Sequence, residues 1–314
     1  MTVELSVVVP VFNEEANLPE LFRRLREVLE ALLPSWELVL VDDGSRDRSW
    51  DLIRELAAAD ARVRGIRLSR NFGHQMALAA GLDTARGVAA VIMDADLQDP
   101  PELIPELVAR WREGFEVVYA VRTRRSGDGA FKRFTAAAFY RLLRRITRVD
   151  IPLDTGDFRL MGRSALDAFR RLPERHRFTR GLVSWLGFQQ VGVPYAREAR
   201  HGGETGYPLR KMVALAVDAI TSFSHVPLQM ATVLGFGVSA FAFAYILVVI
   251  VLKLAGVSWP GYTSLMAAIL FLGGVQLVMI GLLGEYLGRV YDEVKRRPLY
   301  LVRETAGGEP GAGA

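Results

Sequence analysis

The chain has 314 residues, of which 51% are hydrophobic and 24% are charged, and its formal net charge is +4 at pH 7. It contains no cysteine, which excludes a disulfide framework and any thiolate ligand or nucleophile. The mild positive charge fits an anionic lipid or nucleotide as partner, and without a basic stripe interleaved with aromatic residues we expect no nucleic-acid binding.

Short apolar runs alternate with helical periodicity from residue 1 to about 205. This pattern predicts strands at residues 5–11, 37–41, 63–68, 88–93 and 116–120, with helices between them. The alternation is typical of an α/β domain with a mainly parallel, Rossmann-like sheet and right-handed crossovers. We therefore predict one such domain over residues 1–205.

Acidic residues follow three of the predicted strands, within residues 13–15, 42–45 and 94–99. Parallel strands place their carboxyl ends along one edge of a sheet, where ligands bind in open α/β folds. For Asp42 and Asp43 two interpretations stay open. They contact a nucleoside, or they build the turn before the next helix.

The third cluster indicates a site for a divalent cation. Asp94, Asp96 and Gln98 follow an apolar strand and offer only oxygen donors, which suit Mg²⁺ or Mn²⁺. The spacing excludes an EF-hand starting at Asp94, because Asp99 and Pro105 occupy the positions of its glycine and glutamate. Mg²⁺ is usually bound by one or two carboxylates together with phosphates of the ligand, so a phosphorylated substrate is expected. Asp99 itself is predicted to cap the following helix.

Two long apolar stretches follow, between Asp218 and Lys253 and between Lys253 and Glu285, and neither contains an acid, lysine or arginine. Each exceeds the ~20 residues that a spanning helix needs, which favours membrane spans over a buried core hairpin. We predict a transmembrane hairpin at residues 229–284, with helices at about 230–252 and 264–284.

The flanks of the hairpin are basic, with Arg210 and Lys211 before it and Lys295, Arg296 and Arg297 after it. The positive-inside rule therefore predicts that both flanks and both termini are cytoplasmic. The amino-terminal residues show no signal-peptide pattern, which agrees with this topology.

Amphipathic helices are expected beside the hairpin, over residues 206–228 and 285–302, where basic and apolar residues mix. They lie on the membrane surface or pack against the soluble domain, and both interpretations stay open. Residues 303–314 are rich in glycine, alanine and acids, so we expect a disordered tail.

Several motifs together resemble family 2 glycosyltransferases of the GT-A fold, namely residues 9–15, 41–45 and 94–100. Other motifs are similar to the polyprenyl-phosphate branch of that family, which includes dolichyl-phosphate mannose synthase and bacterial undecaprenyl-phosphate glucosyltransferases. These are residues 70–73, 155–160 and 203–207. The resemblance covers nearly the whole chain.

This resemblance implies an inverting, multi-pass enzyme of the bacterial plasma membrane, with its catalytic domain in the cytoplasm. The enzyme would transfer one sugar from a nucleotide-diphosphate sugar, UDP-glucose being the first expectation, to undecaprenyl or another polyprenyl phosphate. Mg²⁺ or Mn²⁺ would be the cofactor, and relatives suggest a homo-oligomer such as a tetramer. The alternatives are a processive polysaccharide synthase and a non-catalytic nucleotide-binding scaffold. The synthase is disfavoured because the chain has neither its Gln-x-x-Arg-Trp element nor its additional spans.

The resemblance also implies roles for individual residues. The nucleotide-binding residues would be Pro10, Phe12, Glu14, Asp42, Asp43 and Asp94. The metal ligands would be Asp94, Asp96 and Gln98, and the catalytic residues Asp96 and Asp157. We expect the acceptor phosphate to contact basic residues, for which solvated surface charge is the alternative: Arg122, Lys132, Arg133, Arg159 and Arg200.

Asp157 need not act as a base, because a lipid phosphate monoester has a second pKa near ~6 and is mostly dianionic at neutral pH. Asp157 would then hold a sugar hydroxyl, orient an arginine or pair with Arg159. Residues 175–178 and Arg180 are expected to border the site. Where many relatives have Ser-Lys-Tyr, this chain has residues 205–207, Thr-Gly-Tyr, so we carry over no lysine contact there.

Overall fold

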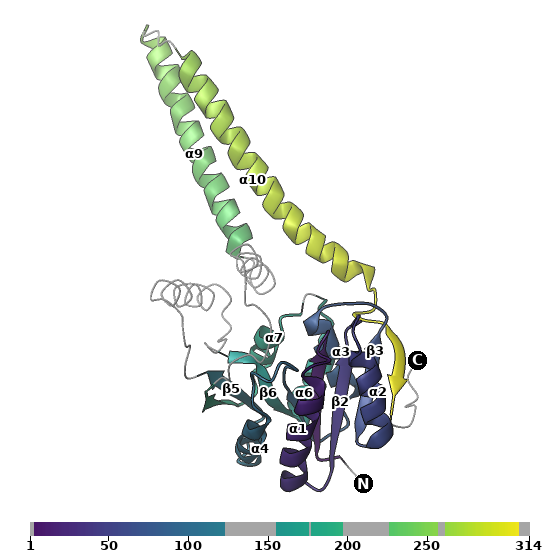
Figure 1. The fold of residues 1–314 in the computed structure, drawn as a ribbon. Coiled ribbons are helices and arrows are strands. Elements are labelled where there is room, and N and C mark those ends of the chain that lie inside the picture. The colour runs from purple at the N-terminus through teal and green to yellow at the C-terminus, as the bar shows by residue number, and fades with distance from the viewer. Residues whose placement is uncertain (1–2, 123–154, 176, 197–225, 257–260, 308–314) are drawn as a thin grey trace. The chain divides into compact units, whose positions relative to one another are not determined.

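The computed structural model describes residues 3–122, 155–175, 177–196, 226–256 and 261–307 (Figure 1). The chain divides into two compact units. A sheet unit comprises residues 1–144, 148–207 and 297–314, and a hairpin unit comprises residues 145–147 and 208–296. The sheet unit therefore includes the residues that follow the hairpin, which the predicted boundary at residue 205 did not.

The sheet has eight strands in the order β7-β5-β6-β4-β1-β2-β3-β8. Their bounds are β1 Leu5–Val11, β2 Trp36–Asp42, β3 Val63–Leu68, β4 Ala89–Ile92, β5 Val117–Arg122, β6 Thr155–Gly162, β7 Gln190–Tyr195 and β8 Val302–Ala306. Strands β4, β1, β2 and β3 are parallel neighbours, and β7 is parallel to β5. Strand β6 runs antiparallel to β4 and β5, and β8 runs antiparallel to β3. The five predicted strands and the mainly parallel centre are confirmed.

Helices cover both faces of the sheet, which explains why β1 and β2 are buried along their whole length. Helices α1 (Leu18–Leu32), α2 (Ser49–Ala59) and α4 (Ile104–Arg112) contribute to the main core, and the short helix η1 (Pro101–Leu103) leads into α4. Helices α3 (His74–Thr84) and α6 (Arg163–Arg170) pack on the other face, and α7 (Thr179–Trp185) contacts α6. Gly81 of α3 makes this packing close, because a Cβ there would lie 2.2 Å from Val8.

The described part of the hairpin unit contains α9 (Val226–Leu254) and α10 (Tyr262–Lys295), both long and apolar enough to cross a membrane. The predicted spans lie within them. Residues 285–295 continue α10 without a break, so the separate helix expected at 285–302 is wrong. The amphipathic helix expected at 206–228 lies outside the described residues, except for 226–228, which begin α9.

Residues 303–306, which were expected to be disordered, belong to β8, and residues 308–314 lie outside the described residues. The edge of β3 offers unpaired backbone groups, which β8 satisfies from Leu68 opposite Val302 to Gly65 opposite Ala306, with a shift of register between Arg67 and Leu68. Arg67 and Glu304 add an ion pair at 3.0 Å. Because β3 and β8 lie far apart in the sequence, the short polar segment itself does not predict that it forms a strand.

Candidate active site at the carboxyl ends of the central strands

The loops that follow β1 and β2 are held together by hydrogen bonds. The amide of Asn13, whose φ is +56°, donates to the Ser45 hydroxyl at 3.0 Å, and the Glu14 amide donates to the Ser49 hydroxyl at 2.9 Å. In return the Arg46 amide donates to Asn13 Oδ1 at 2.9 Å. These contacts fix one rim of the site.

Asp42 and Asp43 turn out to have different positions. Asp42 is fully buried, accepts a hydrogen bond from the Ser45 amide at 3.1 Å and pairs with Arg67 Nε at 3.3 Å. It builds the turn and does not line the cleft, so the structure does not support its predicted contact with a nucleotide. Asp43 lines the cleft and accepts hydrogen bonds from the amides of Phe72 and Gly73, at 2.7 and 2.9 Å.

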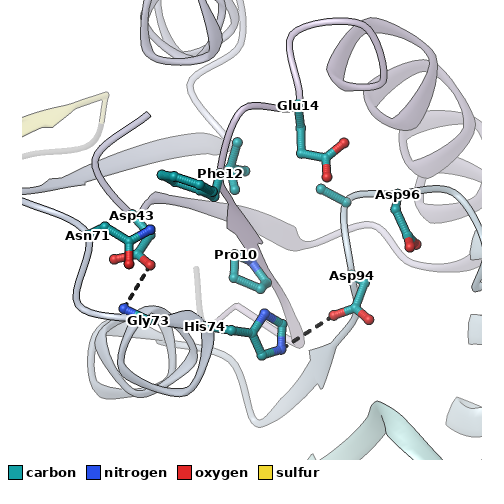
Figure 2. Close-up of a pocket in the computed structure, with 11 residues that line it drawn as sticks. Pro10, Phe12, Glu14, Asp43, Asn71, Gly73, His74, Asp94 and Asp96 are labelled. Carbon is teal, nitrogen blue, oxygen red and sulfur yellow. Dashed lines mark hydrogen bonds and ion pairs between the residues drawn. The ribbon is translucent and has the colours of Figure 1, made fainter. Parts of the chain in front are cut away.

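A cleft of about 300 Å³ opens between these loops and the end of β4 (Figure 2). It brings together six predicted site residues: Pro10, Phe12, Glu14, Asp43, Asp94 and Asp96. Its other lining residues are Val11, Asn71, Gly73, His74 and Ala95. The Phe12 side chain is 43% exposed and offers an aromatic surface beside the acids.

The segment after β4 gathers negative charge. Burial, together with the charges of Asp99, Asp157 and Asp96, raises the pKa of Asp94 to about 6, although His74 opposes this shift. Asp96 Oδ1 accepts a hydrogen bond from the Gln98 amide at 3.2 Å, and Gln98 itself does not line the cleft. Within the described ranges no three His, Cys, Asp or Glu side chains are grouped to hold a metal ion by themselves. Two carboxylates under mutual repulsion nevertheless fit a cation that completes its shell with phosphates.

Asp99 does not cap a helix, contrary to the prediction. Helix η1 begins at Pro101 without a side-chain cap, and the carboxylate of Asp99 is buried, where it accepts a hydrogen bond from the Tyr195 hydroxyl at the end of β7. This partner lies far away in the sequence, so the local Asp-Pro-Pro pattern could not reveal it.

Asp157 lies on β6, and its carboxylate is held at both oxygens. Gln75 Nε2 donates to Oδ2 at 3.1 Å, and Arg180 Nε donates to Oδ1 at 3.0 Å. His74 Nε2 lies 3.3 Å from Oδ2. Burial alone would raise the pKa of Asp157, but His74, Arg180 and Arg159 outweigh it and hold this pKa well below its ordinary range. Asp157 is therefore ionised at neutral pH.

His74, the first residue of α3, is a site residue that the sequence analysis missed. Its Nε2 also lies 3.5 Å from Asp94 Oδ1 (Figure 2). The imidazole therefore connects the end of β4 with Asp157. Burial lowers the pKa of His74, but the hydrogen bond to Asp157 and the charge of Asp94 exceed that effect and raise it. The available signal was its position directly after the recognised motif at residues 70–73.

The predicted phosphate-binding residues that the structure describes, Arg122 and Arg159, lie in different environments. Arg159 is 3% exposed and donates to the carbonyl oxygens of Gly156 at 3.0 Å and Asp157 at 3.3 Å, while burial lowers its pKa to about 10. It supports the strand from within and is not placed to contact an acceptor. Arg122 is partly exposed and donates to the Tyr195 hydroxyl at 3.3 Å, so it stays a candidate. Lys132, Arg133, Arg200 and residues 203–207 lie outside the described residues.

Comparison with known proteins bears on the whole chain. Residues 6–170 match Glycosyl transferase family 2, and residues 226–290 match the GtrB C-terminal hairpin. The uncharacterized glycosyltransferase YkcC of Bacillus subtilis is 52% identical over 97% of this chain and 95% of its own length. The bactoprenol glucosyl transferase of Shigella phage SfII is 44% identical over 98% of this chain and 100% of its own length. The predicted GT-A type of α/β fold is confirmed, and this glycosyltransferase belongs to glycosyl transferase family 2.

Proposed function

We propose that this enzyme transfers a single glucosyl group from UDP-glucose to undecaprenyl phosphate or another polyprenyl phosphate. The observation that carries the proposal is the 44% identity, over nearly the full length of both chains, to a protein named bactoprenol glucosyl transferase. The acidic cleft and the two apolar helices agree with it, since the donor is a nucleotide sugar and the acceptor is a lipid.

The cleft suits a nucleotide-diphosphate sugar. Its volume of about 300 Å³ lies at the lower end of the range of ligand pockets, which is ~300 to 1,000 Å³. Pro10, Phe12, Glu14 and Asp43 would surround the nucleoside. Asp94 and Asp96, with Gln98 beside them, would hold Mg²⁺ or Mn²⁺ together with the diphosphate. When bound, the cation stabilises negative charge on the departing nucleoside diphosphate.

The reaction would be a single displacement with inversion. An oxygen of the acceptor phosphate forms a bond to the anomeric carbon while the bond from that carbon to the diphosphate oxygen breaks. The dianionic phosphate has no proton to lose, so the step depends mainly on positioning. Asp157 fits this scheme because a carboxylate with its pKa held so low is a poor proton acceptor and a good anchor for His74 and Arg180.

We place the enzyme in the bacterial plasma membrane, with α9 and α10 as its spans and the cleft on the cytoplasmic side. The basic residues on both sides of the hairpin support this topology. Arg122 would contact the acceptor phosphate, together with Lys132, Arg133 and Arg200. We further propose that the enzyme is a homo-oligomer, such as a tetramer.

A transfer assay with purified full-length protein tests the proposal. Undecaprenyl phosphate is incubated with labelled UDP-glucose, UDP-N-acetylhexosamine or GDP-mannose, in the presence of Mg²⁺, Mn²⁺ or a chelator. We expect label from UDP-glucose to enter the organic phase only with a divalent cation, and Asp96→Ala to abolish transfer without loss of folding. Label in a long water-soluble polymer would show a processive synthase instead, and turnover of no donor would favour a scaffold.

A further inference from the structure

Gln75, the second residue of α3, makes hydrogen bonds with both ends of its amide. Its Nε2 donates to Asp157 Oδ2 at 3.1 Å. Its Oε1 accepts hydrogen bonds from the Thr179 amide at 3.1 Å and from the Thr179 hydroxyl. One partly buried side chain therefore joins α3, β6 and α7 at the site.

The contact with Thr179 also concerns Arg180. Thr179 is the first residue of α7, and Arg180 follows it directly and donates to Asp157 Oδ1 at 3.0 Å. The two oxygens of Asp157 are thus contacted from α3 and from α7, and Gln75 connects these helices. A shift of α7 would move Arg180 away from the carboxylate.

We propose that Gln75 is a positioning residue for glycosyl transfer, which orients the Asp157 carboxylate directly and the Arg180 guanidinium through Thr179. This rests on the proposed function. The position needs a donor at one end and an acceptor at the other, which only an amide of this length supplies. Glutamate would keep the acceptor for Thr179 but place a second carboxylate against Asp157, and methionine would remove both contacts.

The test compares Gln75→Glu, Gln75→Met and Thr179→Val with the wild-type protein in full-length form. Gln189→Glu is the matched control, because Gln189 is exposed and lies just before β7, at the opposite end from Tyr195. The measurements are kcat and KM for UDP-glucose, the affinity for UDP with Mg²⁺, and the melting temperature.

We expect Gln75→Glu to lower kcat about 100-fold, the scale of loss that a misplaced reacting group produces, and Gln75→Met to lower it about 10-fold or more. Because the nucleoside part of the cleft is untouched, KM and the UDP affinity should stay within about threefold of wild type. Thr179→Val keeps the backbone contact and should lose less activity. The inference is overturned if Gln75→Glu keeps its kcat, or if kcat falls only in proportion to UDP binding, as a purely structural role would give.

A second measurement does not depend on transfer. The melting temperatures of Gln75→Met, Asp157→Asn and the double variant form a cycle, in which contacting residues give non-additive losses. Non-additive losses support the contact, and additive losses would overturn the inference even in an active enzyme. If the wild-type protein transfers no sugar, it is the proposed function that fails, and the cycle decides about Gln75.

Discussion

Asp157 shows how a buried charge is kept in this enzyme. Its neighbours contact both oxygens and stabilise the ionised form, so its pKa in the folded protein lies below the ordinary value of 3.8. A carboxyl group of this kind contributes stability above pH ~4 and loses that contribution as the pH falls below it, because the unfolded chain then binds the proton first.

Replacing Asp157 by asparagine removes this charge and leaves the buried guanidinium of Arg159 without the carboxylate that lies 4.0 Å from it. We expect Asp157→Asn to destabilise the folded protein at pH 7 by about 3 kcal/mol or more. The difference in free energy of unfolding between wild type and the variant should shrink as the pH is lowered below ~4, where wild-type Asp157 begins to lose its stabilising contribution. Thermal unfolding in detergent between pH 7 and pH 3.5 measures this gap. The exposed Asp51→Asn should show little effect at any pH, and a gap of constant size for Asp157→Asn would contradict the explanation.

Single residues differ in how well the sequence reveals them. Acids at strand ends could be predicted, because parallel strands gather their carboxyl ends at one edge. Asp42 and Asp43 could not be told apart, since successive side chains of a strand point to opposite faces and the sequence does not say which face carries the cleft. His74 and Gln75 could not be assigned either, because their contacts with β6 arise only when α3 packs on the sheet.

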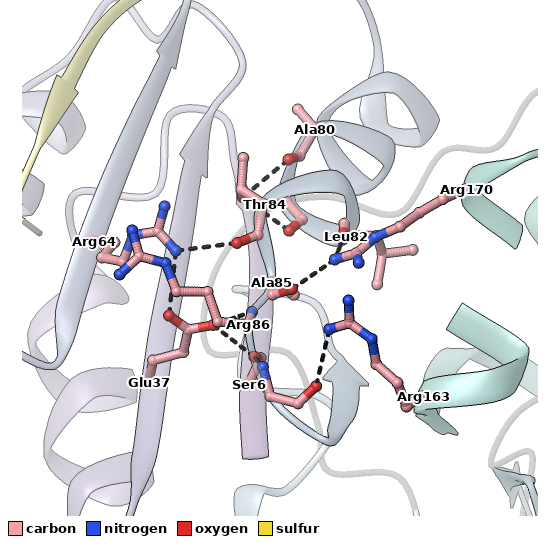
Figure 3. A network of polar contacts seen from close by, with 12 residues as sticks. Ser6, Glu37, Arg64, Ala80, Leu82, Thr84, Ala85, Arg86, Arg163 and Arg170 are labelled. Carbon is pink, nitrogen blue, oxygen red and sulfur yellow. Dashed lines mark hydrogen bonds and ion pairs between the residues drawn. The ribbon is translucent and has the colours of Figure 1, made fainter. Parts of the chain in front are cut away.

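Helix α3 carries His74 and Gln75 at its first turn, and its last turn is held by arginines (Figure 3). Arg170 Nε donates to the Leu82 carbonyl at 2.9 Å, Arg170 Nη2 also reaches the Ala85 carbonyl, and Arg64 donates to the Thr84 carbonyl at 3.0 Å. Carbonyls at a helix end have no partner within the helix, and positive charge is favourable there. The arginines therefore fix the far end of the helix that presents the two site residues.

Arg170→Met keeps the length of the side chain but leaves these carbonyl oxygens without their donor. We expect it to lower the free energy of unfolding by about 1–3 kcal/mol, measured as a lower melting temperature. Arg54→Met is the matched control on α2, because the Arg54 side chain is 56% exposed and pairs with Asp51, whose side chain is 51% exposed. That change should cost less than about 0.5 kcal/mol. Equal losses in both variants would show that the carbonyl contacts contribute nothing.

Among the elements, the parallel strands were predictable because burial on both faces makes them continuous apolar runs. Strands β6 and β7 were not predicted. The first contains Asp157 and Arg159, whose opposite charges are both buried and lie 4.0 Å apart. Charged residues in a sequence normally indicate an exposed segment, so this strand was not recognised as buried. The second contains Gly192 and Pro194, residues that disfavour strands in sequence patterns.

At the scale of the whole molecule, the chain passes from the sheet unit to the hairpin unit and then returns to the sheet. Strand β8 contributes the outermost strand beside β3, and Tyr300 just before it donates to Asp83 at 2.9 Å. The two charge-free stretches made the hairpin predictable, but nothing in the short polar segment after it indicated this return.

We expect a shortened chain that ends at Leu301 to be less stable than one that ends at Gly307. The first lacks β8 and exposes the edge of β3, whereas the second keeps every described strand. Loss of the β8 pairing should lower the melting temperature by about 4–8 °C, which corresponds to roughly 2 kcal/mol, and should increase aggregation. Light scattering and thermal unfolding check both effects, and identical behaviour of the two chains would refute the role given to β8.

The return of the chain to β3 also sets an order of events during translation. Residues 226–295 are synthesised before residues 302–306, so α9 and α10 exist before the last strand does. Throughout that interval the nascent sheet lacks its edge strand, and the backbone groups of β3 are open to other chains. The ribosome therefore completes α9 and α10 before it makes the strand that closes this edge of the sheet.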